Sequence, residues 1–156
     1  LMIIKNDNNK TIIDIKIKEL TYINELSMTI GLFVLSIGTF LGGVWANESW
    51  GRYWAWDPKE TWALISMIIY AAVLHFHLIP GLKGRFLLNA ASVFAFYSIM
   101  MTSFGVNYYL TGLHSYATGD PVPIPKFIYV VTVVVLLLTV WAYYKQQKNN
   151  KKSCKA

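Results

Sequence analysis

Long stretches of the chain carry no Asp, Glu, Lys or Arg, and short polar segments separate them. The four charge-free stretches cover residues 26–47, 61–82, 86–119 and 127–144. A helix needs roughly 20 apolar residues to cross the hydrocarbon of a bilayer. The third stretch fits one crossing and a polar loop, and the others fit one crossing each. The pattern therefore predicts four membrane spans, near residues 28–46, 61–79, 87–106 and 127–144.

The spans are expected to be helical, because backbone groups inside lipid must hydrogen-bond within their own segment. Valine is abundant in residues 130–135 and would favour a strand in water. The length of the uncharged run around it favours a helix instead. We therefore predict an all-α integral membrane protein with about four transmembrane helices and a tryptophan-rich outer segment.

The N-terminal part, residues 1–27, has a different pattern. Ile13, Ile15 and Ile17 alternate with charged residues, which is typical of a strand. The apolar residues between Glu19 and Leu26 have helical spacing instead. We expect an extended cytoplasmic connector followed by a short interfacial helix. No basic head precedes an apolar core, so no signal peptide is expected.

The composition supports a membrane protein. Hydrophobic residues make up 55% of the 156 residues and charged residues only 14%, against about 25% charged in an average soluble domain. A short soluble chain has a large surface to cover with polar groups, so this composition argues against one. The single cysteine excludes a disulfide scaffold, and the apolar clustering excludes disorder.

Basic residues predict the orientation of the spans. The segments 80–86 and 145–156 together carry a charge of +7, whereas 46–60 carries −1 and 107–126 is neutral. The basic side is expected to be the cytoplasm, and 145–156 is then a cytoplasmic tail following a transmembrane domain over 28–144. The net charge of +6 is explained by topology, and no nucleic-acid partner is predicted. The chain is expected to cross the membrane several times.

Five of the six tryptophans fall between residues 45 and 62, on the predicted outer side. They are Trp45, Trp50, Trp54, Trp56 and Trp62. An aromatic belt at the membrane surface would explain one or two tryptophans at a helix end, but not five in one hairpin. The functional alternative is a flat platform for a large planar ligand, because indole faces stack on extended π systems.

The residues Asp57-Pro58-Lys59-Glu60 predict the start of the second span. Asp57 suits the N-cap, Pro58 the first helical position and Glu60 the third, as in a capping box. Such a start would hold the neighbouring tryptophans in place. A helix N-terminus also attracts anions, and with Arg52 and Lys59 nearby it could hold the carboxylates of a ligand.

Two of the three histidines, His75 and His77, lie in the second span. His75 is roughly 26 Å along the helix from Pro58, near the cytoplasmic edge. A regular helix would place the two side chains about 200° apart, so they are expected to face different ways. Small residues one turn above His75 leave room for a ligand, whereas His77 is expected to be interfacial. A His75 that only hydrogen-bonds a neighbouring helix is the alternative.

The third histidine, His114, lies in the second outer loop, which is stiffened by Gly and Pro. A neutral imidazole there could ligate a metal, although a lone loop histidine is often only solvated. The combination of tryptophans, cations and histidines indicates a flat, carboxylated ligand with an iron centre, for which haem is the match. The chain has no Cys-x-x-Cys-His for covalent attachment to itself.

Two motifs carry a family resemblance. The segment WGRYWAWDPKETW, with WAN before it and LH after it, resembles the tryptophan-rich WWD signature of haem-handling proteins in cytochrome c maturation. The segment GVNYYLTGLHSYATGDPVPIP resembles the System II CcsA (ResC) family, or the CcsA half of a fused CcsBA. The resemblance runs from about Glu19 to Tyr144.

The resemblance implies a haem exporter and holocytochrome c synthase that works with CcsB in the lipid of a bacterial inner (cytoplasmic) membrane. Haem b is then cargo: it binds a transmembrane site with one iron ligand matching His75. It next reaches an outer site with one ligand matching His114, where its vinyl groups meet the thiols of apocytochrome c. The haem-binding residues predicted from both lines of reasoning are Trp45, Trp50, Gly51, Arg52, Trp54, Trp56, Asp57, Trp62, His75 and His114.

The chain departs from the family pattern because no histidine precedes residue 75. The partner ligands would belong to upstream spans or to CcsB, so we expect a C-terminal part of a longer chain, inactive alone. Two alternatives stay open: a haem-binding electron-transfer subunit, and a structural or transport membrane subunit without haem. The first would pair histidines at matched depth, which His75 and His114 do not offer.

Overall fold

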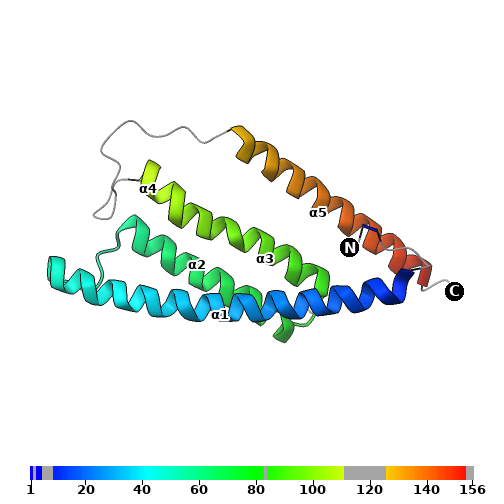
Figure 1. Ribbon diagram of the computed structural model, residues 1–156, viewed down its shortest axis with the longest axis horizontal. Helices are drawn as coiled ribbons and strands as arrows, with labels where there is room; N and C mark the ends of the chain where they lie inside the picture. The colour runs from blue at the N-terminus through cyan, green and yellow to red at the C-terminus, as the bar shows by residue number, and fades with distance from the viewer. Residues whose placement is uncertain (2, 5–8, 83, 111–125, 154–156) are drawn as a thin grey trace. The chain divides into compact units, whose positions relative to one another are not determined.

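The computed structural model describes residues 1, 3–4, 9–82, 84–110 and 126–153, and the regular structure within them is helical (Figure 1). The α-helices are α1 (Lys10–Trp50), α2 (Pro58–Leu74), α3 (Arg85–Met100), α4 (Val106–Tyr109) and α5 (Lys126–Ser153). A 3₁₀ turn, η2 (His75–Leu78), follows α2, and a π-helical turn, η3 (Met101–Gly105), joins α3 to α4. The predicted all-α fold is confirmed, including the helix over the valine-rich 130–135.

Within the described ranges, four helical stretches are long and apolar enough to cross a membrane, which confirms the four predicted spans. They are Lys10–Trp50, Pro58–Leu78, Arg85–Gly105 and Lys126–Lys148. At 1.5 Å per residue, the 41 residues of α1 extend about 60 Å, roughly twice the hydrocarbon thickness of a bilayer. Much of α1 therefore lies outside the span that its charge-free part provides.

The extended connector expected around Ile13 to Ile17 is wrong, because α1 already begins at Lys10. Ile13, Ile17 and Thr21 are all buried and recur every four residues, so they share one face of a helix. Lys16 Nζ also pairs with Glu19 Oε2 at 2.9 Å, one helical turn away. The longer helical period outweighs the local alternation of isoleucine and charge. The division into functional parts at residues 27 and 144 stays a prediction.

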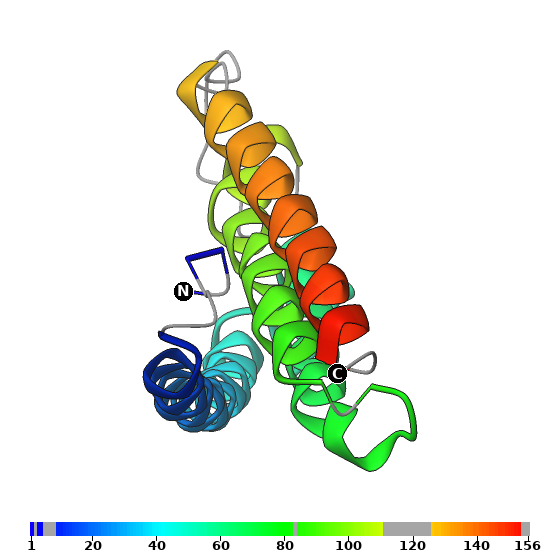
Figure 2. The same cartoon turned by 90° about the vertical axis from the view of Figure 1, so that its right-hand side faces the viewer.

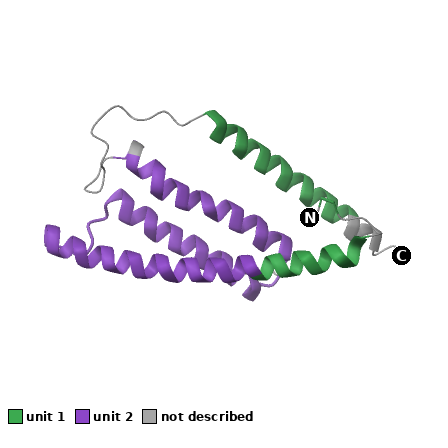
Figure 3. Ribbon diagram, viewed as in Figure 1, with its two compact units in different colours: residues 1–22, 123–156 green, residues 23–122 purple. Residues whose placement is uncertain are grey.

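The chain forms two compact units, residues 1–22 with 123–156 and residues 23–122 (Figure 3). In the first unit, Lys145 Nζ donates a hydrogen bond to the carbonyl oxygen of Ile3. The second unit contains most of α1 together with α2, α3 and α4, and it holds the tryptophan-rich segment. In this unit α2 and α3 run side by side in opposite directions, and Figure 2 views α1 nearly along its axis.

The core of the second unit joins three helices. Met28 of α1, Val73 of α2 and Leu88 of α3 are buried in one apolar cluster. A polar contact ties α1 to α3 beside it: Asn24 Nδ2 donates to Asn89 Oδ1 at 3.0 Å and lies 2.9 Å from the Ser92 hydroxyl. Helices in membranes associate through such packing and hydrogen bonds, because lipid supplies no hydrophobic driving force. These contacts join α1, α2 and α3 near the C-terminal end of α2, which is the end away from the turn between α1 and α2.

Candidate functional site

The turn between α1 and α2 has two residues in the left-handed backbone region. Gly51 has a φ of +70°, which glycine adopts without a side-chain clash. Trp56 has a φ of +58°, a conformation that costs a residue with a Cβ about 1–2 kcal/mol. The Trp56 side chain is also 71% exposed, so burial of its ring does not offset this cost. The surrounding hydrogen bonds must hold the turn in place.

Most of those hydrogen bonds belong to the capping box at the start of α2. The structure confirms this capping box, which the sequence predicts. The buried Asp57 carboxylate accepts from the backbone N–H of Lys59 at 3.2 Å. Glu60 Oε2 accepts from two turn amides, Ala55 N at 2.8 Å and Asp57 N at 3.4 Å. The Glu60 carboxylate therefore fixes the backbone on both sides of Trp56.

Four of the clustered tryptophans form two edge-to-face pairs. The ring centroids of Trp45 and Trp50 are 5.1 Å apart with planes at 78°, and those of Trp54 and Trp56 are 6.0 Å apart at 86°. Neither pair offers one common flat face, so the predicted platform can consist only of individual rings. The fifth, Trp62, lies within α2, where its carbonyl oxygen is 3.2 Å from the Thr102 hydroxyl.

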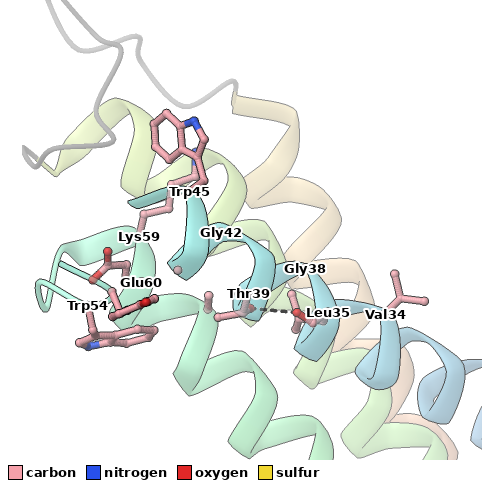
Figure 4. Close-up of a pocket in the computed structure, with 12 residues that line it drawn as sticks. Val34, Leu35, Gly38, Thr39, Gly42, Trp45, Trp54, Lys59 and Glu60 are labelled. Atoms are coloured by element: carbon pink, nitrogen blue, oxygen red, sulfur yellow. Dashed lines mark hydrogen bonds between the residues drawn. The ribbon is translucent and has the colours of Figure 1, made fainter. Parts of the chain in front are cut away.

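A cavity of about 670 Å³ lies between α1 and the start of α2 (Figure 4). This volume is within the range of about 300–1,000 Å³ that is usual for small-molecule sites. Glycines of α1 line one wall, Gly38, Gly42 and Gly43. A Cβ added at Gly38 or Gly42 would meet no atom within 4 Å. Gly38 and Gly42 thus face open space, whereas a Cβ at Gly43 would lie 3.2 Å from the carbonyl oxygen of Tyr53.

The aromatic wall of the cavity contains Trp45, Tyr53 and Trp54, and the polar residues Lys59 and Glu60 lie on the side of α2 (Figure 4). The Nε1–H of Trp54 is buried, and no described residue accepts a hydrogen bond from it. A buried N–H without an acceptor is costly. The lining of the cavity, with its aromatic rings, glycines and few polar groups, is suited to an aromatic molecule.

The structure brings some predicted site residues to the cavity and leaves others away from it. Trp45 and Trp54 line it, and each contacts one further tryptophan. Gly51, Arg52 and Trp62 are not among the residues that line it. Sequence reasoning missed Tyr53 and the glycines, although the spacing of Gly38 and Gly42 was a visible signal of helix packing.

The two histidines of the second span lie at the opposite end of α2 from the cavity. His75 Nδ1 is 2.6 Å from the carbonyl oxygen of Ala71, and His77 Nδ1 is 2.8 Å from that of Leu74. A neutral ring that donates from Nδ1 keeps its lone pair on Nε2, the atom that can bind a metal. Both histidine side chains are exposed, so a metal could reach either ring.

The prediction that these two rings face different ways is wrong. Their centroids are 6.4 Å apart and their planes differ by 18°, as in a stacked pair. The helix tightens into the 3₁₀ turn His75–Leu78 at this point, so the regular α-helical angle no longer applies. The remaining candidate, His114, lies outside the described residues. Among the residues that are described, no three His, Cys, Asp or Glu side chains form a metal site.

Comparison with known proteins identifies a family. A family model described as cytochrome C assembly protein matches residues 2–114. The protein NrfI of Wolinella succinogenes is 56% identical over 122 residues, which are 78% of this chain and 14% of NrfI. Cytochrome c biogenesis protein CcsA of Gloeobacter violaceus is 48% identical over 87 residues, covering 56% of this chain and 25% of that protein. CcsA of Prochlorococcus marinus is 46% identical over 99 residues, covering 64% and 32% respectively. The chain thus spans less than a third of the length of these relatives.

Proposed function

The chain belongs to the cytochrome C assembly protein family, and from this premise we propose that it binds haem b as cargo and presents it for attachment to apocytochrome c. Membership already makes it a multi-pass membrane protein of cytochrome c biogenesis, in agreement with its four spans. Haem is flat and largely apolar, with two carboxylates at one edge. A binding site for haem must match these features.

The cavity between α1 and α2 carries the proposal. Its volume of about 670 Å³ suits a ligand of this size, and the rings of Trp45 and Trp54 line it. The glycine wall provided by Gly38 and Gly42 lets a planar molecule approach the backbone of α1. The capping box of α2 holds the backbone next to Trp54, because Glu60 accepts from the N–H of Ala55.

The histidines divide the proposed path into an inner and an outer part. His75 lies 17 residues after Pro58, about 26 Å along the helix, so it cannot bind the iron of a haem held near the start of α2. We assign His75 to an inner, cytoplasmic site and His114 to the outer site. The second iron ligand at each site would come from another segment or from CcsB.

At the outer site, the role of this chain would be to hold and orient the haem. Attachment adds each cysteine S–H of apocytochrome c across one vinyl C=C: a C–S bond forms and the thiol hydrogen ends on the neighbouring vinyl carbon. No oxidant is required for this addition. Holding the haem plane between the tryptophans and the glycine wall fixes which vinyl meets which thiol, and such positioning accelerates a reaction between two bound partners.

The proposal is tested by replacing the lining tryptophans. Trp45→Ala and Trp54→Ala should each lower haem retained per protein severalfold, because each removes an aromatic contact with the bound plane, worth about 0.5–1.5 kcal/mol. Trp141→Ala is the matched control, since Trp141 lies on α5 and is 57% exposed. The readouts are haem absorbance of the purified membrane protein and the yield of covalent cytochrome c. Equal retention in all three variants would refute the assignment of haem to this cavity.

A further inference from the structure

Lys59 occupies an unfavourable position in α2. It is the second residue of the helix, where the free N–H groups create positive potential and a cation is destabilising. It also lines the cavity and is half-buried. A charge of the wrong sign at a helix start is a local conflict of the kind found at functional sites. The carboxylates of Asp57 and Glu60 at this helix start accept hydrogen bonds from the backbone, and a negatively charged ligand group in the cavity would add a counter-charge for Lys59.

The Lys59 ammonium is held by a residue from another helix. Lys59 Nζ donates to Asn107 Oδ1 at 3.2 Å, and Asn107 Nδ2 donates to the carbonyl oxygen of Ser103 at 2.6 Å. Because the amide nitrogen is engaged by a carbonyl, the amide oxygen is the atom that must face the ammonium. The orientation of Asn107 therefore presents a hydrogen-bond acceptor to the Lys59 ammonium.

The π-helical turn Met101–Gly105 sets the direction of Asn107. One extra residue in a helical turn rotates everything after it by about 100°. The turn is fixed against α2: the buried Ser66 hydroxyl lies 3.1 Å from the Thr102 hydroxyl. Met101 packs closely against Gly105, since a Cβ at residue 105 would lie 2.2 Å from Met101 Sδ and this flexible side chain would have to move. π-bulges often occur at functional sites.

We propose that Lys59 binds one carboxylate of the haem in the cavity, and that Asn107 is a positioning residue that directs its ammonium. This inference rests on the proposed function and deepens it. An ammonium carries three N–H donors, so it can hold the Asn107 oxygen and a carboxylate oxygen together. The carboxylate edge of the haem would then lie against the start of α2, which fixes the rotation of the haem within its own plane.

The test compares haem with haem dimethyl ester, which has the same ring and no negative carboxylates. Both are titrated into the purified membrane protein and followed by absorbance. The wild-type protein should bind haem about tenfold more tightly than the ester, equivalent to about 1.4 kcal/mol. Lys59→Met should abolish this preference by weakening haem binding while leaving the ester unchanged. Lys126→Met, at the start of α5, is the matched control and should keep the full preference.

Asn107 is tested by a pair of variants. Asn107→Leu should reduce the preference for haem partly, because Lys59 keeps its charge and loses its direction. Asn107→Gln keeps a neutral amide oxygen as acceptor for the ammonium and should recover more of the preference than Asn107→Leu. A merely structural role would weaken haem and ester equally in both variants.

The outcomes separate this inference from the function on which it rests. Equal affinity of the wild-type protein for haem and ester, or an undiminished preference in Lys59→Met, would overturn the assignment of Lys59 alone. Binding of neither compound by the wild-type protein would overturn the haem function and this assignment with it.

Discussion

Replacing Glu60 should loosen the tryptophan-bearing turn before it disturbs the rest of the protein. Glu60 Oε2 accepts from Ala55 N at 2.8 Å and from Asp57 N at 3.4 Å. Hydrogen bonds to charged groups contribute about 1.5–3 kcal/mol. The second bond is long and both are only partly buried, so we take about 2 kcal/mol for Glu60→Ala. That change corresponds to roughly 30-fold more frequent local opening.

Amide hydrogen exchange of the turn measures this opening directly. In Glu60→Ala, the amides of Ala55 and Asp57 should exchange roughly 30-fold faster, because their shared acceptor is gone. Glu60→Gln keeps an acceptor oxygen without the charge and should give an intermediate increase of about fivefold. Amides in the middle of α3 should exchange at the wild-type rate in both variants.

Glu48→Ala is the matched control, since Glu48 is exposed near the end of α1 and precedes the turn. It should leave the exchange of both turn amides within twofold of wild type. Unchanged exchange at Ala55 and Asp57 in Glu60→Ala would refute the reasoning that one carboxylate holds this turn. Faster exchange throughout α3 would show instead that the substitution destabilises the whole bundle.

Three further substitutions address the remaining predictions. Trp56→Gly should release about 1 kcal/mol of backbone strain at φ +58° and should bind as much haem as the wild type. Trp54→Ala should bind severalfold less haem. Equal haem content in the two variants would contradict this prediction. His75→Ala should lower the amount of haem bound at the inner site. A small fraction of histidine-ligated haem should remain, bound by the stacked ring of His77. If a variant with both histidines replaced has the same haem spectrum as His75→Ala, His77 does not bind the remaining haem. A cysteine at Ser49 should react in intact cells with an impermeant thiol reagent and the native cysteine should not, and the reverse labelling would invert the topology.

The parts of the fold that the sequence predicts correctly depend on local signals. The four spans follow from the length of charge-free stretches, and the start of α2 follows from Asp57, Pro58 and Glu60. Each of these signals lies within one helix or one turn. Lipid strengthens the first of them, because a backbone inside it has few alternatives to a helix.

The features that sequence reasoning missed depend on longer distances or on local departures from ideal geometry. The contact between Lys59 and Asn107 joins residues 48 positions apart, and only the fold brings them together. The stacking of His75 and His77 occurs in a 3₁₀ turn that the residue types of HFHL do not predict. The alternation around Ile15 indicated a strand because the buried helical stripe is visible only over a longer window.

Two consecutive residues at the start of α2 have different roles in our proposal: Glu60 stabilises the turn, and Lys59 binds the ligand. Glu60 is occupied by the backbone of the turn, and its negative sign suits the helix N-terminus. Lys59 has the opposite sign, gains nothing from that position and contacts Asn107 from another helix. Both residues line the cavity, but adjacent helical residues point about 100° apart, so Glu60 can hold the turn while Lys59 extends toward Asn107. Loss of Glu60 should therefore disturb the turn with or without haem, whereas loss of Lys59 should be felt only by a ligand that carries a carboxylate.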